Sequence, residues 1–180
     1  MVVYLDCAAT SPVDSRVSKE VIKYTDYEFG NAGSRSHDFG NRAKSAVEKA
    51  RSKVARVVNA NRGEIIFTSG ATESNNLAIL GLSDYGLKIG KNHIISTKIE
   101  HKSVLESLEN LANRGFKVTL LSPNSGGWIE PKTVIKALQD NTLLVSVMQV
   151  NNETGVIQPI KAIASLLKQH DTYFHVDAAQ

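Results

Sequence analysis

Short apolar runs alternate with longer amphipathic stretches along the chain. Runs rich in β-branched and aromatic residues predict strands at about residues 2–5, 65–67, 92–97, 116–121, 143–150 and 173–176. Apolar residues at three- and four-residue steps predict helices at about residues 14–27, 36–59, 101–114, 131–138 and 160–170, with a further helix after Gly70. Strands and helices in this alternation predict an α/β fold with a mostly parallel sheet sandwiched by helices.

Two residues in the N-terminal part of the chain, His37 and Cys7, each have a structural and a chemical interpretation. We expect His37 to serve the start of the helix at residues 36–59, and a ligand role is the alternative. Cys7 is the only thiol, and we expect a small, half-buried residue next to a turn. A nucleophilic cysteine needs an activating base, which the local sequence does not offer.

Composition and charge exclude several classes of function. The 180 residues are 42% hydrophobic and 22% charged, which is typical of a globular domain with a real core. The net charge of +3 comes from interleaved basic and acidic residues, so we expect no direct nucleic-acid binding. No apolar run approaches the roughly 18 residues that span a bilayer, so no membrane partner is expected. One cysteine and the lack of a signal-like segment predict a cytoplasmic protein.

The stretch at residues 65–77 predicts an anion-binding turn. Its apolar, β-branched start predicts a short buried strand, and helical spacing resumes after Gly70. A helix that begins at Gly70-Ala71-Thr72 presents unpaired backbone N–H groups and the positive end of its dipole, which suits a phosphate. The alternative is an ordinary helix capped by Ser69 or Thr72. The stretch has neither a Walker A lysine nor G-x-G-x-x-G, so the phosphate is expected to belong to another kind of ligand.

Polar or small residues follow four of the predicted strands. In open α/β sheets, ligands bind outside the carboxyl ends of the strands. We therefore expect four motifs to meet at one edge of the sheet: Gly70-Ala71-Thr72, Glu100-His101-Lys102, Asn151 to Gly155, and Asp177 to Gln180.

Each motif also has a purely structural interpretation. His101 is either a capping or surface histidine, or a flat ring that faces a flat ligand by stacking or proton transfer. Asn151 and Asn152 are either turn formers or hydrogen-bonding partners of a ligand. Asp177 directly follows an apolar run, so it either caps a turn toward Gln180 or pairs with a cation such as the protonated ring nitrogen of a heterocycle.

The four motifs together suit one cofactor. Pyridoxal 5′-phosphate has a phosphate, a flat ring and a ring nitrogen that needs an acidic partner when the ring acts as an electron sink. A phosphate turn, a flat stacking residue, an amide and a carboxylate therefore predict a site for this cofactor.

Six segments of the chain, in order, share a further pattern: Tyr4-Leu5-Asp6 with Ala9 to Pro12, Gly30-Asn31 through Ser36-His37, Thr68 to Asn76, Glu100-His101-Lys102, Val150 to Gly155, and Val176 to Gln180. Together they resemble the NifS/IscS-type cysteine desulfurases, which are fold-type I pyridoxal-phosphate enzymes of the class V aminotransferase group. The resemblance covers the whole chain.

The resemblance implies a reaction and a set of site residues. The family removes sulfur from L-cysteine and leaves L-alanine and a protein persulfide, which a sulfur-acceptor protein passes on to iron–sulfur clusters, tRNA thiolation or DNA phosphorothioation. The implied roles are phosphate binding for Ala71 and Thr72, ring stacking and proton transfer for His101, contact with the ring hydroxyl and the substrate for Asn152, pairing with the ring nitrogen for Asp177, and a hydrogen bond to the phenolic oxygen for Gln180.

The family also uses groups that follow the Asp-Ala-Ala-Gln motif. They are a Ser-x-His-Lys segment whose lysine bonds to the cofactor, a loop with the persulfide cysteine, and an arginine for the substrate carboxylate. Lys102 and Cys7 do not occupy these positions. We expect residues 1–15 to form an N-terminal segment and residues 16–180 an incomplete large pyridoxal-phosphate domain, with the small C-terminal domain absent.

The chain alone is therefore expected to be inactive. The main hypothesis is a cysteine desulfurase completed by a complementary C-terminal chain or by a homo-oligomer. The alternatives are a non-catalytic pyridoxal-phosphate-binding or scaffold protein, or part of a selenocysteine lyase or another class V aminotransferase.

Overall fold

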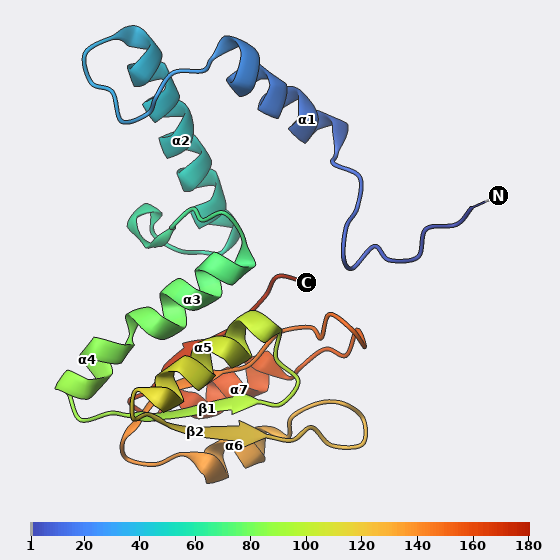
Figure 1. Cartoon of the computed structure of the whole chain (residues 1–180), viewed down its shortest axis with the longest axis vertical. Helices are drawn as coiled ribbons and strands as arrows, with labels where there is room; N and C mark the ends of the chain where they lie inside the picture. The colour runs from blue at the N-terminus through green and yellow to red at the C-terminus, as the bar shows by residue number, and fades with distance from the viewer. Residues whose placement is uncertain (1) are drawn as a thin grey trace. The chain divides into compact units, whose positions relative to one another are not determined.

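A computed structural model describes residues 2–180 (Figure 1). Contacts between Cα atoms divide the chain into two units, one ending at Phe67 and one beginning at Thr68, and each is described separately below. The division expected at residue 15 stays a prediction. No helix within residues 2–180 combines the length and the apolar character needed to cross a membrane.

The first unit is helical. It contains α1 (Ser15–Ile22), a π-helical turn (Lys23–Tyr27), α2 (Asp38–Val57) and a 3₁₀ turn (Arg62–Glu64). The Asp14 carboxylate caps α1 by accepting the Arg16 N–H at 2.8 Å. The His37 Nδ1 caps α2 by accepting the Gly40 N–H at 3.2 Å, which confirms the expected role of His37 at this helix start.

Two segments that the sequence predicts as strands are not strands. Residues 2–5 and 65–67 are irregular, and no strand within residues 2–180 pairs with either of them. Extended backbone becomes a strand only when a neighbour accepts and donates its hydrogen bonds, so the apolar residues alone do not suffice. The expected burial at residues 65–67 is also wrong, because Ile66 and Phe67 are exposed. Cys7 lies in a turn as expected, but it is exposed rather than half-buried.

The second unit is built on a four-stranded sheet. Its strands are β1 (His93–Thr97), β2 (Lys117–Leu121), β3 (Thr142–Ser146) and β4 (Tyr173–His175), in the order β2-β1-β3-β4, and all described pairs are parallel. The predicted mostly parallel sheet is therefore confirmed. β3 is shorter than predicted, although the Val147 N–H still donates to the carbonyl of His175 in β4 and the Gln149 N–H to that of Asp177 just after β4.

Helices cover both faces of this sheet. They are α3 (Ala71–Gly81), α4 (Ser83–Lys88), α5 (Lys102–Asn113), α6 (Pro131–Ala137) and α7 (Ile160–Leu167). Ile94 of β1 and Leu144 of β3 pack in one buried cluster with residues of α3 and α5, whereas Ile95 and Val145 pack in another with residues of α6 and α7. Successive side chains of a strand point to opposite faces, so β1 and β3 each contribute side chains to both layers.

Candidate functional site

Three of the four predicted motifs meet at one edge of the sheet. Because β1, β3 and β4 are adjacent and parallel, their carboxyl ends lie together, and the segments at 100–102, 151–155 and 177–180 follow them. The fourth motif, Gly70-Ala71-Thr72, does not follow a strand. It belongs to α3, which lies against α5 and reaches the same edge through a buried side chain, Asn75.

The start of α3 is open. Its N-cap is Gly70 and no side chain caps the first turn, so the alternative of a helix capped by Ser69 or Thr72 is wrong. The first helical hydrogen bond runs from the Ser74 N–H to the Gly70 carbonyl, which leaves the N–H groups of Ala71 and Thr72 ahead of it. Apart from its own chain neighbours, nothing lies within 4 Å of the place where a side chain on Gly70 would begin. These N–H groups are therefore accessible to an anion.

Ser69 and Glu73 form a small cluster beside this turn. The Glu73 carboxylate accepts the N–H and the hydroxyl of Ser69, each at 2.6 Å, and these hydrogen bonds hold the pKa of Glu73 below its usual value. The acidic side chain is thereby drawn toward Ser69.

Asp177 is buried and accepts two hydrogen bonds from neutral groups. Its Oδ2 accepts Asn75 Nδ2–H at 2.8 Å, and its Oδ1 accepts the Ala179 N–H at 3.1 Å. The hydrogen bond from the Ala179 N–H closes a turn that leads toward the exposed Gln180, as the structural interpretation of Asp177 predicts. A carboxylate offers about four lone-pair sites, so two neutral donors leave acceptor capacity at Asp177.

His101 caps α5. Its Nδ1 accepts the Ser103 N–H at 3.1 Å and lies 2.9 Å from the Ser103 hydroxyl oxygen. A neutral imidazole that accepts at Nδ1 carries its proton at Nε2. His101 is therefore a helix cap, as its structural interpretation predicts. This role uses Nδ1 and leaves the exposed Nε2–H for contact with a ligand.

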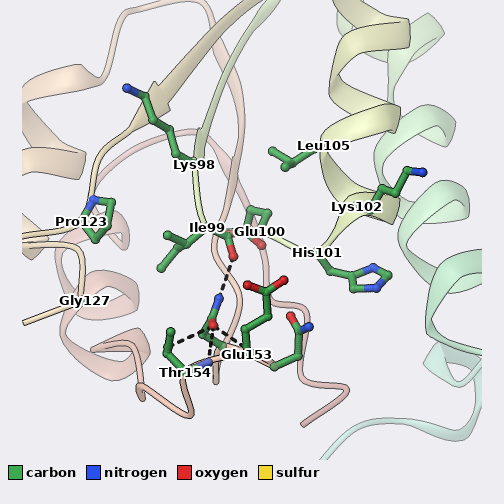
Figure 2. A pocket seen from close by; sticks show the side chains of 12 residues that line it. Lys98, Ile99, Glu100, His101, Lys102, Leu105, Pro123, Gly127, Glu153 and Thr154 are labelled. Atoms are coloured by element: carbon green, nitrogen blue, oxygen red, sulfur yellow. Dashed lines mark hydrogen bonds between the residues drawn. The ribbon is translucent and has the colours of Figure 1, made fainter. Parts of the chain in front are cut away.

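Asn151 and Asn152 have different roles. The side-chain Oδ1 of the buried Asn151 accepts the N–H groups of Glu153 and Thr154 and the Thr154 hydroxyl, so Asn151 is the turn former. Asn152 is half-buried, and its side chain makes no hydrogen bond with the residues that the structure describes. Asn152 lines a pocket of about 620 Å³ together with His101. Figure 2 shows His101 in this pocket.

Glu100 lies buried at the same edge. Its Oε1 accepts the Thr97 hydroxyl at 2.7 Å and the Met148 N–H at 3.0 Å, while Oε2 has no partner among residues 2–180. Burial, with a smaller contribution from the Asp177 carboxylate, raises the pKa of Glu100 to about 7 against the opposing effect of the two hydrogen bonds.

We expect Glu100→Gln to remove a pH dependence of folding stability. The unfolded pKa is 4.5 and the folded pKa is about 7, so the folded state binds more protons between these values and loses stability as pH rises. Between about pH 5 and about pH 8 this loss amounts to roughly 2–3 kcal/mol, which the glutamine variant should not show. Denaturant unfolding followed by Trp128, the only tryptophan, measures the difference.

The matched control for that variant is Glu109→Gln, an exposed glutamate on α5. It should unfold with the wild-type pH dependence. If Glu100→Gln also keeps the wild-type dependence, the burial of Glu100 does not control this part of the stability profile.

The sequence interpretation missed Asn75, Ser103 and Glu100 as site residues. The signal for Asn75 was present, because it lies four positions before Ile79 on the buried side of α3, where an apolar residue is the norm. Ser103 likewise interrupts the buried stripe of Val104 and Leu108 on α5. Residues 2–180 contain no group of three or more His, Cys, Asp or Glu side chains that could hold a metal ion.

The aminotransferase class-V family matches residues 3–180. The chain belongs to this family. The match spans the α/β unit with the strand-end motifs and the helical unit before it.

Several relatives of this chain carry the name cysteine desulfurase IscS. The chain is 50% identical to the cysteine desulfurase IscS of Colwellia psychrerythraea over 180 residues, which cover 99% of this chain and 44% of the relative. Among solved structures it resembles DndA from Streptomyces lividans (56% identity, TM-score 0.88, 99% of this chain and 49% of that one). It also resembles SspA in complex with cysteine (41% identity, TM-score 0.93, 98% and 50%). The chain thus spans about half the length of the relatives it matches.

Proposed function

We propose that this chain forms the cofactor-binding part of a cysteine desulfurase, which takes sulfur from L-cysteine and leaves L-alanine and a protein-bound persulfide. The observation that carries the proposal is the meeting of His101, Asn152 and Asp177 at the carboxyl edge of adjacent strands, with α3 joined to that edge. The identity of 50% to an IscS enzyme over this part supports the same reaction.

The donors at this edge suit pyridoxal 5′-phosphate. The open turn of α3 offers the N–H groups of Ala71 and Thr72 to a phosphate, with no side chain over Gly70. Asp177 is a buried carboxylate with acceptor capacity left, as the protonated nitrogen of a heterocycle requires. We assign Ala71, Thr72, His101, Asn152, Asp177 and Gln180 to this cofactor. When bound, it supplies an electron sink for the carbon atoms of an amino acid.

The protein groups supply orientation and a proton. Asp177 favours the charged form of a ring nitrogen because an anion at hydrogen-bonding distance stabilises a cation. His101 presents Nε2–H, so this atom donates or accepts the proton beside the ring, while Nδ1 stays engaged by the start of α5. The Asn152 amide lies beside the same pocket and can hydrogen-bond a substrate oxygen.

We assign three further groups to positions outside these 180 residues: the lysine that bonds to the cofactor, the persulfide cysteine and the arginine for the substrate carboxylate. We further propose a cytoplasmic location, a homo-oligomeric assembly and a sulfur-acceptor protein as partner. Family membership supports all three.

Reconstitution tests this function. We expect the chain mixed with a polypeptide carrying the second half of an IscS relative, pyridoxal phosphate and a thiol reductant to release sulfide from L-cysteine, whereas neither polypeptide does so alone. In the mixture, His101→Ala should lower the rate by about two orders of magnitude or more, because general acid–base groups contribute roughly 10²–10⁴-fold. The matched control is His170→Ala, an exposed histidine that should leave the rate unchanged.

Two results would contradict the proposal. A folded mixture that holds the cofactor but stays inactive would favour a binding or scaffold role. A strong preference for L-selenocysteine, or amino transfer to a keto acid, would instead favour another enzyme of the class V group.

A further inference from the structure

A continuous path of hydrogen bonds joins Asp177 to His101. Asn75 of α3 lies at its centre, with Nδ2 at 2.8 Å from Asp177 Oδ2 and 2.9 Å from Ser103 Oγ. The Ser103 Oγ lies 2.9 Å from His101 Nδ1. Asn75 is 3% exposed, Ser103 5% and Asp177 8%, so water does not offer these groups an alternative partner. The path connects three elements that are far apart in sequence.

The direction of each hydrogen bond in the path is fixed by chemistry. The Asn75 amide nitrogen carries two protons, and an ionised Asp177 only accepts, so one proton goes to Asp177 and the other to Ser103. Ser103 Oγ then accepts from Asn75 and directs its own proton to His101 Nδ1. Both protons of the Asn75 amide are therefore used.

We propose that Asn75 is a positioning residue that fixes Asp177 and His101 relative to each other. The proposed function identifies the ligand between these two groups, and the inference rests on it in that respect. A heterocycle must meet the carboxylate at its nitrogen and the imidazole at its face, so a shift of either group misplaces the other contact. Asn75 couples Asp177 to His101 because its one planar amide group donates a hydrogen bond to Asp177 and another to Ser103, which contacts His101.

An aspartate at position 75 separates the donor role of Asn75 from its shape. It has the same size but donates nothing when ionised, and it places a second carboxylate against Asp177. Two carboxylates at this distance share one proton, so lowering the pH restores a donor between them. Asn75→Ala has no donor at any pH.

Other titratable groups surround this path. Glu100 follows β1 and His175 lies on β4, and both interact electrostatically with Asp177, while His101 lies at the start of α5. Their titration is present in every variant, so comparison of Asn75→Asp with Asn75→Ala at each pH removes their effect.

The first measurement is the dissociation constant of pyridoxal phosphate for the full chain. At about pH 8 we expect Asn75→Asp and Asn75→Ala to bind at least about tenfold more weakly than wild type, because a buried hydrogen bond to a charged group is lost. At about pH 5.5 the Asp variant should recover to within about threefold, whereas the Ala variant should not. The matched control is Asn113→Asp, an exposed asparagine at the end of α5, and it should bind like wild type.

The second measurement needs no cofactor. In wild type, the ¹⁵N resonance of His101 Nδ1 reports the Ser103 hydrogen bond. We expect this resonance to shift in Asn75→Asp, because the new carboxylate takes the Ser103 proton, and in Ser103→Ala, which loses the hydroxyl but keeps Asn75 with Asp177. Asn113→Asp should leave the resonance unchanged. Ser103→Ala also keeps the test valid if Asn75→Asp fails to fold.

The outcomes separate this inference from the proposed function. If wild type binds pyridoxal phosphate and Asn75→Asp binds equally well at about pH 8, Asn75 does not position the site. If the His101 resonance is the same in wild type and Ser103→Ala, the path does not reach His101 and the inference fails. If wild type does not bind pyridoxal phosphate, the proposed function fails, while the resonance still decides whether Asn75 and Ser103 control His101.

Discussion

Replacing Asp177 with alanine is expected to weaken pyridoxal phosphate binding by about a hundredfold or more. Truncating one partner of a buried, hydrogen-bonded charge pair costs roughly 2–5 kcal/mol, and each 1.4 kcal/mol is about a factor of ten. The Asp177 side chain is 8% exposed, so water does not replace the missing carboxylate well. The same change leaves the Asn75 amide and the Ala179 N–H without their acceptor. Equilibrium dialysis of the full chain against pyridoxal phosphate measures the change.

Asp177→Asn separates charge from shape in this experiment. It keeps a carbonyl oxygen for the Ala179 N–H but has no negative charge for a ring nitrogen, so we expect a loss close to that of the alanine variant. The matched control is Asp171→Asn, a fully exposed aspartate ahead of β4 that pairs with Lys91 at 2.8 Å. Exposed ion pairs contribute about 0–1 kcal/mol, and binding should not change. Wild-type affinity in Asp177→Asn would show that the carboxylate does not bind a cation.

The sheet could be predicted from the sequence because each strand carries its own local signal. Ile94 and Ile95 are both buried although they point to opposite faces, which produces the continuous apolar run typical of a parallel strand between two helical layers. The segment at 65–67 has the same residue types and is not a strand. The residues of a short segment show whether its side chains suit a strand. A strand also requires a hydrogen-bonding neighbour, which the segment's own sequence does not reveal.

The site could be predicted in part for a related reason. Parallel strands bring their carboxyl ends to one edge, so motifs that follow strands, such as those with His101, Asn152 and Asp177, can be grouped without coordinates. The contact between Asn75 and Asp177 spans 102 positions in the sequence and joins a helix to a strand end. Nothing local to Asn75 reveals its partner, and a polar residue on a buried helix face indicates only that a partner exists.

The edge that carries the site depends on the core beneath it, and Ile94→Ala is expected to test this. Ile94 is fully buried between the sheet and helices α3 and α5, where it packs in the same cluster as Ile79 and Val104. Truncating a buried isoleucine to alanine costs about 2–5 kcal/mol, because transfer free energy is lost and a cavity remains. Denaturant unfolding followed by Trp128 fluorescence measures the loss in the unit that begins at Thr68.

The control for Ile94→Ala is Ile157→Ala, because Ile157 is 71% exposed and truncation there removes little buried surface. We expect its effect to stay within about 0.5 kcal/mol. Asn75 and Ser103 lie on the two helices that pack over Ile94, so relaxation of α3 or α5 into the cavity should also weaken pyridoxal phosphate binding. Equal losses in the two isoleucine variants would show that the α3–α5 layer does not stabilise the sheet. A large loss of stability with unchanged affinity would show that the hydrogen bonds of Asn75 hold the edge without support from this core.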